Sequence, residues 1–345
     1  ATRKAGYKHR KIIDLSNKYV RQLMVIALPV IISSAAGEIS IIVDNSMASA
    51  FFGEKSVAIL FYAKTMLTLI TGVITVSVTT ALFPKISEYG QTGRINEMKA
   101  SISSSVVTTM LLVIPATIGL MVLANPVIEL VYQRKAFTRE DTIAVASMMV
   151  SYAPFIIFQS ITDVVDRGFY AVGDSKTPVI IVVIQQLINV ILNAVLIKFY
   201  GLNGIAYSTV ISTIIGSSLM IYKFRDNFGS FKFKNTLLSI VKIFAITAVM
   251  ALVAGKIYTI TADLMPHILS VLLSILLAAV VYGFLILLAR IPEVMEIINS
   301  IYHKHFKKRK AQKHINTNKS EHVKVPGKNR RSIETTRKYE YRKRQ

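Results

Sequence analysis

Long runs of apolar residues alternate with short polar segments along the middle of the chain. A helix needs roughly 20 residues to cross the ~30 Å hydrocarbon core of a bilayer, and about eight runs reach that length. Backbone groups without partners cost several kcal/mol each in lipid, so these runs must be helices. The pattern predicts an all-α polytopic membrane protein with spans near residues 21–50, 56–83, 104–132, 141–171, 177–199, 203–224, 236–260 and 266–290.

One shorter segment has an amphipathic pattern. In residues 94–102, Ile95, Met98 and Ile102 fall at helical spacing on one face, with charged residues opposite. This pattern is typical of a helix that lies in a membrane interface. We therefore expect a separate helix at the inner interface before the third span.

Basic residues are concentrated at the two ends of the chain. Of 41 Lys and Arg, 7 lie in residues 1–21 and 17 in residues 290–345. With residues 1–21 on the cytoplasmic side, the inside segments hold 34 of these residues and the outside loops hold 6. The positive-inside rule then places both termini in the cytoplasm. The basic tail from His303 has few aliphatic residues, so we expect it to be disordered and to contact anionic membrane lipids.

Composition and motifs exclude several functional classes. A hydrophobic content of 52% excludes a disordered chain, and basic residues gathered at two ends argue against a nucleic-acid-binding domain. The chain has no cysteine, and its six histidines lie in tails or a loop. No HExxH, GxSxG or Walker A motif occurs. We expect neither an enzyme nor a nucleic acid partner, and we interpret Asp163, Asp166 and Arg167 as a structural salt bridge.

Three charged side chains lie within the first two predicted spans. A charge at mid-bilayer costs at least ~2.5–3.5 kcal/mol, so each one needs a reason. Glu38 and Asp44 lie on related but distinct faces of the first span. They either face a hydrated cavity or a cation, or they are neutralised within the helix packing. Lys64 lies about 12 Å into the second span, where it either snorkels outward or meets an anionic substrate.

A polar stripe runs along the fifth predicted span. Gln185, Asn189 and Asn193 repeat every four residues and therefore share one helical face. The sixth span carries hydroxyls at Thr209, Ser212 and Thr213. Together with Asp44, these side chains are oxygen donors of the kind that hard cations such as sodium select. Amides and hydroxyls also join membrane helices by contacts worth ~0.6 kcal/mol each, so the pattern leaves both interpretations open.

Three segments of the chain form a specific combination. They are VYQRKAFTREDT (131–142), GFYAVGDSKTPV (168–179) and TTALFPKIS (79–87). Together they resemble signature segments of the MurJ (MviN) lipid II flippase family, within the multidrug/oligosaccharidyl-lipid/polysaccharide exporter superfamily. The resemblance covers about residues 20 to 225 and is weaker in the last two spans.

This resemblance implies a V-shaped molecule with two six-helix lobes and two extra C-terminal helices. The eight spans would equal the second lobe plus the extra pair, so we expect the chain to lack the first lobe. The expected organisation is a basic cytoplasmic lead in 1–20, a six-helix lobe in 21–225, two additional helices in 236–290 and a basic cytoplasmic tail in 291–345.

The resemblance also implies site residues. The family's proposed cation site corresponds to Asp44, Asn189, Asn193, Thr209 and the carbonyl of Ile205. Asn193 stands where some relatives have Asp, so we expect weaker sodium binding. No cofactor other than a possible sodium ion is expected.

A second set of positions is expected to line the substrate cavity. Many relatives have an arginine in a YA-x-R-L pattern, and this chain has Thr65 at the arginine position, directly after Lys64. We expect Glu38, Lys64 and Thr65 to contact the substrate.

The function implied by the resemblance is transport of a lipid. A flippase of this family would turn the lipid-linked peptidoglycan precursor lipid II from the inner to the outer leaflet of a bacterial plasma membrane, for cell wall biogenesis. We expect a monomer whose partner is lipid II or a related polyprenyl-linked glycan. The alternatives are another exporter of the superfamily, for polyprenyl-linked oligosaccharides or drugs, and a membrane-embedded polyprenyl-lipid transferase.

Overall fold

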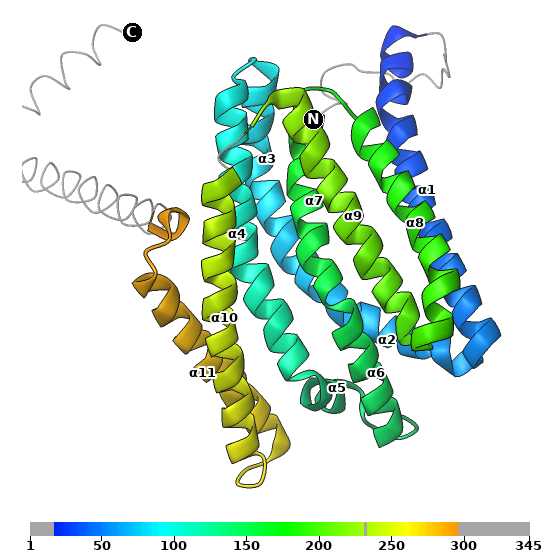
Figure 1. Ribbon diagram of the computed structural model, residues 1–345, viewed down its shortest axis with the longest axis vertical. Helices are drawn as coiled ribbons and strands as arrows, with labels where there is room; N and C mark the ends of the chain where they lie inside the picture. Colours follow the sequence, from blue (N-terminus) through cyan, green and yellow to red (C-terminus); the bar gives the residue numbers. More distant parts are fainter. Residues whose placement is uncertain (1–16, 231–232, 296–345) are drawn as a thin grey trace, which may run out of the picture. The chain divides into compact units, whose positions relative to one another are not determined.

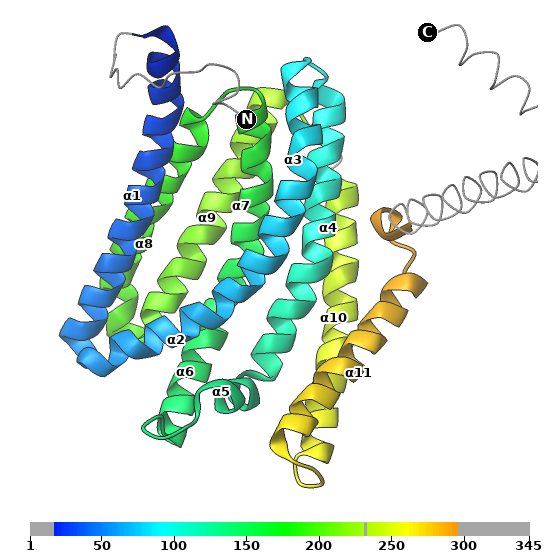
Figure 2. The same ribbon diagram turned by 180° about the vertical axis from the view of Figure 1, so that it is seen from behind.

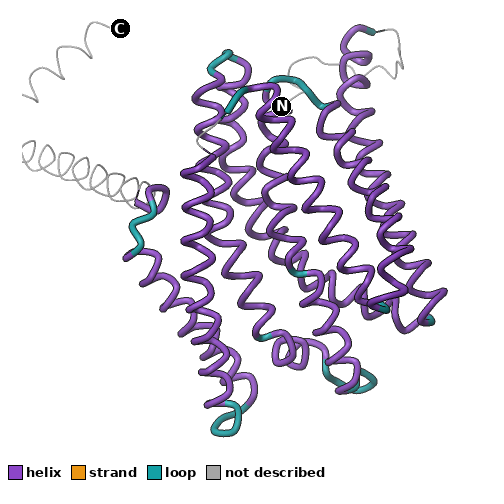
Figure 3. Tube along the Cα trace, in the orientation of Figure 1, coloured by secondary structure: helices purple, strands orange, loops and turns teal. Residues whose placement is uncertain are grey.

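The computed structural model describes residues 17–230 and 233–295, which are almost entirely helical and contain no strand (Figures 1 and 3). The helices belong to one compact unit, residues 1–293. Most of the basic lead and of the basic tail lies outside the described residues. The elements are α1 (Lys18–Phe52), α2 (Glu54–Ile70), η2 (Thr71–Thr75), α3 (Val76–Gln91), α4 (Ile95–Val122), α5 (Ala124–Tyr132), α6 (Arg139–Tyr152), α7 (Pro154–Ala171), α8 (Lys176–Tyr200), α9 (Asn203–Phe228), α10 (Phe233–Thr261) and α11 (His267–Leu288).

Seven helical stretches of the described residues are long and apolar enough to cross a membrane. They are Glu54–Gln91, Ile95–Val122, Arg139–Ala171, Lys176–Tyr200, Asn203–Phe228, Asn235–Thr261 and His267–Leu288. The remaining predicted span, 21–50, coincides with α1, a continuous helix of 35 residues. The all-α polytopic fold is confirmed, while a crossing by α1 stays a prediction.

The amphipathic segment 94–102 is not a separate interfacial helix. It forms the first turns of α4, and its apolar residues Met98 and Ile102 are fully buried. A Cβ atom built on Gly168 of α7 would lie only 2.5 Å from Cδ1 of Ile102, so the two helices approach closely there. The apolar residues that suggested a membrane interface are instead buried in the helix packing, with Ile102 close to α7.

The predicted span 104–132 also ends too late, because a proline interrupts it. α4 ends at Val122 and α5 follows as a separate short helix. In a continuous helix the ring of Pro126 would clash with the carbonyl four residues earlier, which is that of Val122, and Pro126 has no N–H to donate. The chain therefore turns at Leu123 before the helical conformation resumes.

A π-helical segment, η2, interrupts the second span, and α2 and α3 run in different directions on either side of it (Figure 2). Three threonine hydroxyls in this region, those of Thr65, Thr68 and Thr71, donate to carbonyls three or four residues earlier. Such bonds compete with the backbone ladder and bend helices. The hydroxyls of Thr75 in η2 and Ser160 in α7 lie 2.8 Å apart and join the interrupted span to its neighbour.

The last two helices pack against α4 and α5. α10 lies against α4 and α11. Four buried apolar residues form the contact, Leu123, Met250, Ala254 and Ala278. The hydroxyl of Tyr282 donates to the carbonyl of Leu111 over 2.6 Å. These contacts fix α10 and α11 beside α4, away from the helices that form the polar site described below.

The closest helix contact near that site lies between α8 and α9. They are joined by Gly201 and Leu202, and a Cβ on Gly204 would lie 2.5 Å from the carbonyl carbon of Leu196 and 2.7 Å from the nitrogen of Ile197. Because these are backbone atoms, they have little freedom to move aside. Glycine at 204 therefore lets α9 approach α8 closely enough for their polar side chains to meet.

Candidate functional site

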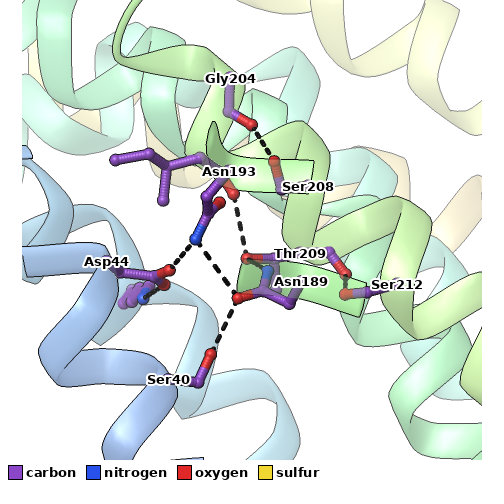
Figure 4. A network of polar contacts seen from close by, with 10 residues as sticks. Ser40, Asp44, Asn189, Asn193, Gly204, Ser208, Thr209 and Ser212 are labelled. Atoms are coloured by element: carbon purple, nitrogen blue, oxygen red, sulfur yellow. Dashed lines mark hydrogen bonds and ion pairs between the residues drawn. The ribbon is translucent and has the colours of Figure 1, made fainter. Parts of the chain in front are cut away.

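Polar side chains from α1, α2, α8 and α9 meet in one network (Figure 4). α8 packs against both α1 and α9, and α1 also packs against α2. The predicted stripe of Gln185, Asn189 and Asn193 on α8 is buried between these helices. An apolar helix that carries amides every four residues places them against its neighbours, because amides facing lipid would lose their hydrogen bonds.

Asp44 is held by two donors from two different helices. Its side chain is 4% exposed, and Oδ2 lies 2.9 Å from Nζ of Lys64 on α2. Oδ1 accepts a 2.7 Å hydrogen bond from Nδ2 of Asn193 on α8. The sequence placed Asp44 and Lys64 in two separate sites, a cation site and a substrate cavity. The structure joins them as an ion pair.

Asn189 is the second centre of the network. Its Oδ1 accepts a 2.8 Å hydrogen bond from Ser40 and a longer one, 3.4 Å, from Nδ2 of Asn193. Its Nδ2 donates to the hydroxyl of Thr209 over 3.1 Å, and that hydroxyl donates to the carbonyl of Ile205 over 3.0 Å. All five groups expected to bind a cation therefore lie within one connected set of hydrogen bonds.

The donor set of this network does not fit a free sodium ion as it stands. Sodium needs oxygen ligands, but Asn193 turns its nitrogen toward Asp44 and Asn189. Its Oδ1 is buried and has no hydrogen-bond partner among the described residues. A sodium ion on the Asp44 carboxylate would require Lys64 to leave and the Asn193 amide to turn over.

A cavity of about 330 Å³ lies beside the network. Its charged lining residues are Glu38, Asp44 and Lys64, and Glu38 is exposed. Neutral polar side chains supply much of the remaining wall, namely Ser40, Thr68, Thr71, Gln159, Gln185, Gln186, Thr209 and Ser212. Thr65 is not among the lining residues, and its hydroxyl donates to the carbonyl of Phe61 in its own helix.

Two residues of this site were missed in the sequence. Ser40 lies four residues before Asp44 and therefore on the same face of α1, a spacing that could have indicated it. Tyr152, at the end of α6, is 1% exposed, and the centre of its ring lies 5.1 Å from Nζ of Lys64. Nothing in the local sequence distinguishes Tyr152 from an ordinary core tyrosine.

The expected salt bridge among Asp163, Asp166 and Arg167 is not formed. Asp163 accepts a 2.8 Å hydrogen bond from Gln159 on the same helix, and the guanidinium of Arg167 lies 5.6 Å from the centre of the Phe83 ring. Asp163 and Arg167 are four residues apart and share a helical face, but Gln159 holds the carboxylate and the guanidinium lies over the Phe83 ring instead.

Comparisons with known proteins identify the family. The family model "Lipid II flippase MurJ" matches residues 1–282. A probable lipid II flippase MurJ of Rhizobium meliloti (strain 1021) is 29% identical over 58% of this chain and 37% of its own length. The lipid II flippase MurJ of Thermosipho africanus (strain TCF52B) is 32% identical over 47% of this chain and 33% of its own. The chain spans between a third and about half of the length of such relatives.

Solved structures agree with this assignment. A structure of lipid II flippase MurJ in an inward closed conformation is 26% identical and has a TM-score of 0.66, over 82% of this chain and 57% of that one. A MATE transporter of Vibrio cholerae, VcmN in the bent form, is 16% identical with a TM-score of 0.53, over 70% of this chain and 56% of that one, and shows only the shared fold. With seven apolar helices among its described residues and a family match over residues 1–282, this multi-pass membrane chain belongs to the MurJ lipid II flippase family.

Proposed function

We propose that this chain forms a lobe of a flippase that carries lipid II from the inner to the outer leaflet of a bacterial plasma membrane, by alternating access. The family match over residues 1–282 is the observation that carries the proposal. The polar cavity beside Asp44 supports it, because a hydrated headgroup loses several kcal/mol of hydrogen bonding if it crosses hydrocarbon without polar partners.

The cavity wall has the chemistry that such a headgroup needs. The hydroxyls and amides that line the cavity can exchange hydrogen bonds with water or with sugar and peptide groups. Lys64 is the cationic member of the lining and attracts an anionic substrate group, in competition with Asp44. Opening the cavity on one side separates helices, and the Asp44–Lys64 pair resists separation of α1 from α2.

A positive charge on the Asp44 carboxylate stabilises the helix arrangement in which α1, α2 and α8 meet. This charge shifts the balance between inward-open and outward-open states only if it interacts unequally with the two.

We propose that both termini are cytoplasmic, because 34 basic residues fall on the inside of that arrangement and 6 on the outside. The chain has no cysteine, so single cysteines report topology cleanly. Ala136→Cys, in the α5–α6 loop, is expected to react with a membrane-impermeant maleimide in intact spheroplasts. Asp226→Cys, near the end of α9, is expected to react only after permeabilisation. External labelling of Asp226→Cys would reverse the arrangement.

Transport is tested with the protein in vesicles that contain fluorescent lipid II. A complete flippase that contains this chain as one lobe is expected to carry the label to the outer leaflet several-fold faster than in protein-free vesicles, as measured by quenching with an impermeant reductant. Thr68→Leu is expected to slow this, because Thr68 lines the cavity. Thr65→Leu is the matched control, since both hydroxyls donate to carbonyls of their own helix but Thr65 does not line the cavity.

Two results would contradict this proposal. If lipid II moves no faster than in empty vesicles while a labelled polyprenyl-linked oligosaccharide or a drug does, the chain serves another exporter. If Thr65→Leu slows transport and Thr68→Leu does not, the substrate contacts Thr65, the position of the family's arginine, rather than the cavity wall.

A further inference from the structure

We infer that Lys64 is a built-in cation that takes the place of a sodium ion at Asp44, so that the site of this chain works without a dissociable metal. The inference deepens the proposed function and rests on it only for the role of the site in transport. The contacts that carry it are independent of the substrate.

The first argument is the position of the ammonium. Nζ of Lys64 lies 2.9 Å from Oδ2 of Asp44, which is the distance of a charge-assisted hydrogen bond. The other carboxylate oxygen is held by Asn193. The single negative charge of Asp44 is therefore already balanced by one positive charge of the chain.

The second argument is the orientation of the amide at Asn193. Nδ2 faces the carboxylate, and Oδ1 is buried without a partner among the described residues. A bound cation would attract the oxygen and repel the nitrogen. The observed orientation suits a carboxylate whose cation is held by the other oxygen, and Nζ of Lys64 on α2 contacts that oxygen, Oδ2.

The third argument is that Lys64 is held at the site by its surroundings. Its side chain is 30% exposed, and the face of the Tyr152 ring lies 5.1 Å from the ammonium. Aromatic faces attract cations. A sodium ion approaching Asp44 would meet an ammonium of like charge at close range. Lys64 is covalently attached to the chain, so its ammonium stays nearby even when an ion displaces it from Asp44. It binds the carboxylate again when that ion leaves.

Asn193 fits this arrangement as well. It stands where the resemblance expects Asp in some relatives, and a second carboxylate would leave one negative charge beside Lys64 unbalanced. With Asn193 and Lys64 together, the pair Asp44 and Lys64 is neutral. The two departures from the expected sodium site each make it more positive by one charge, and together they leave it neutral without a bound metal.

The test is the melting temperature of the purified full protein in detergent, in sodium chloride against choline chloride at equal ionic strength. The wild-type protein is expected to melt at the same temperature in both salts. Lys64→Met removes the ammonium but keeps an unbranched side chain, and it is expected to create a sodium response. At sodium about fivefold above its dissociation constant, the rise would be about 1–2 °C.

Three further variants separate the causes. Lys64→Arg keeps the charge and is expected to stay insensitive to sodium. The double variant Lys64→Met/Asp44→Asn is expected to lose the new response. Lys64→Met/Glu38→Gln is expected to keep it, because Glu38 lines the cavity but is not part of the network. Loss of the response in this last variant would assign the ion to Glu38 and overturn the inference.

Two other results would also overturn it. One is a sodium-specific rise in the wild-type protein, a measurement that needs no variant to fold. The other is the absence of any sodium response in both Lys64→Met and Lys64→Gln. Lipid II transport by the wild-type protein is measured in a separate assay. A protein that transports lipid II and is also stabilised by sodium would refute this inference and leave the proposed function standing.

Discussion

Lys64→Met is expected to lower stability more than Asp44→Asn when both are measured without sodium. Removing the lysine leaves a carboxylate that is 4% exposed with one remaining donor, Asn193. Breaking a buried ion pair from one side costs about 3–5 kcal/mol, and the partial exposure of this pair places the loss near the lower value. Removing the carboxylate leaves Lys64, which lines the cavity and turns toward water there, so a loss of about 1 kcal/mol is expected.

The measurement is denaturant or thermal unfolding in detergent with choline chloride as the salt. The double variant Lys64→Met/Asp44→Asn provides the control, because it removes both charges and is expected to be more stable than Lys64→Met alone. Equal losses in the two single variants would contradict the assignment of Asp44 as the buried member of the pair. A larger loss in Asp44→Asn would reverse it.

Gly204→Ala is expected to destabilise the protein by about 3 kcal/mol, a large effect for one methyl group. The added Cβ would lie 2.5 Å from the carbonyl carbon of Leu196, so α9 must move away from α8. Forcing atoms into a packed contact costs about 1–3 kcal/mol, and backbone atoms on the other side leave little relief. The shift would also lengthen the hydrogen bond between Asn189 and Thr209.

Gly283→Ala in α11 is the matched control for this variant. A Cβ there would meet nothing within 4 Å, and alanine favours the helix over glycine by about 1 kcal/mol. This variant is therefore expected to be as stable as the wild type or slightly more stable. If Gly204→Ala behaves like Gly283→Ala, the close approach of α8 and α9 does not hold the network together.

Hydropathy predicted the spans well because the bilayer imposes length and apolar content on every crossing helix. It failed at the third span, where both ends depend on features that hydropathy does not measure. Met98 and Ile102 in residues 94–102 are buried in the helix packing, with Ile102 close to α7. The local hydropathy of that segment cannot predict which helix packs against it. The break at Leu123 follows from Pro126, whose effect falls four residues earlier in the chain, at Val122.

The sequence predicted most residues of the candidate site, but it predicted neither Ser40 and Tyr152 nor the pairing of Asp44 with Lys64. The stripe on α8 was visible because one helix fixes its own spacing. The partnership of Asp44 with Lys64 depends on two helices and on the turn between them. Asp44 lies nine residues before Gly53 and Lys64 eleven after it, so a sharp turn at Gly53 places them at similar depth. Which faces then meet is decided by packing, and the sequence alone left Lys64 free to point elsewhere.

The π-helical segment η2 changes the phase of the buried positions along the second span. Before it, Ser56, Leu60, Ala63 and Leu67 are buried, and from its last residue onward the buried positions are Thr75, Thr79 and Ile86. Seven residues make almost two full α-helical turns, so an uninterrupted helix would place its next buried position at 74 rather than 75. η2 absorbs the one additional residue. Deleting a single residue within 71–75 would therefore restore an unbroken α-helix with both buried faces kept, whereas a deletion within α2 or α3 would rotate every later side chain by about 100°.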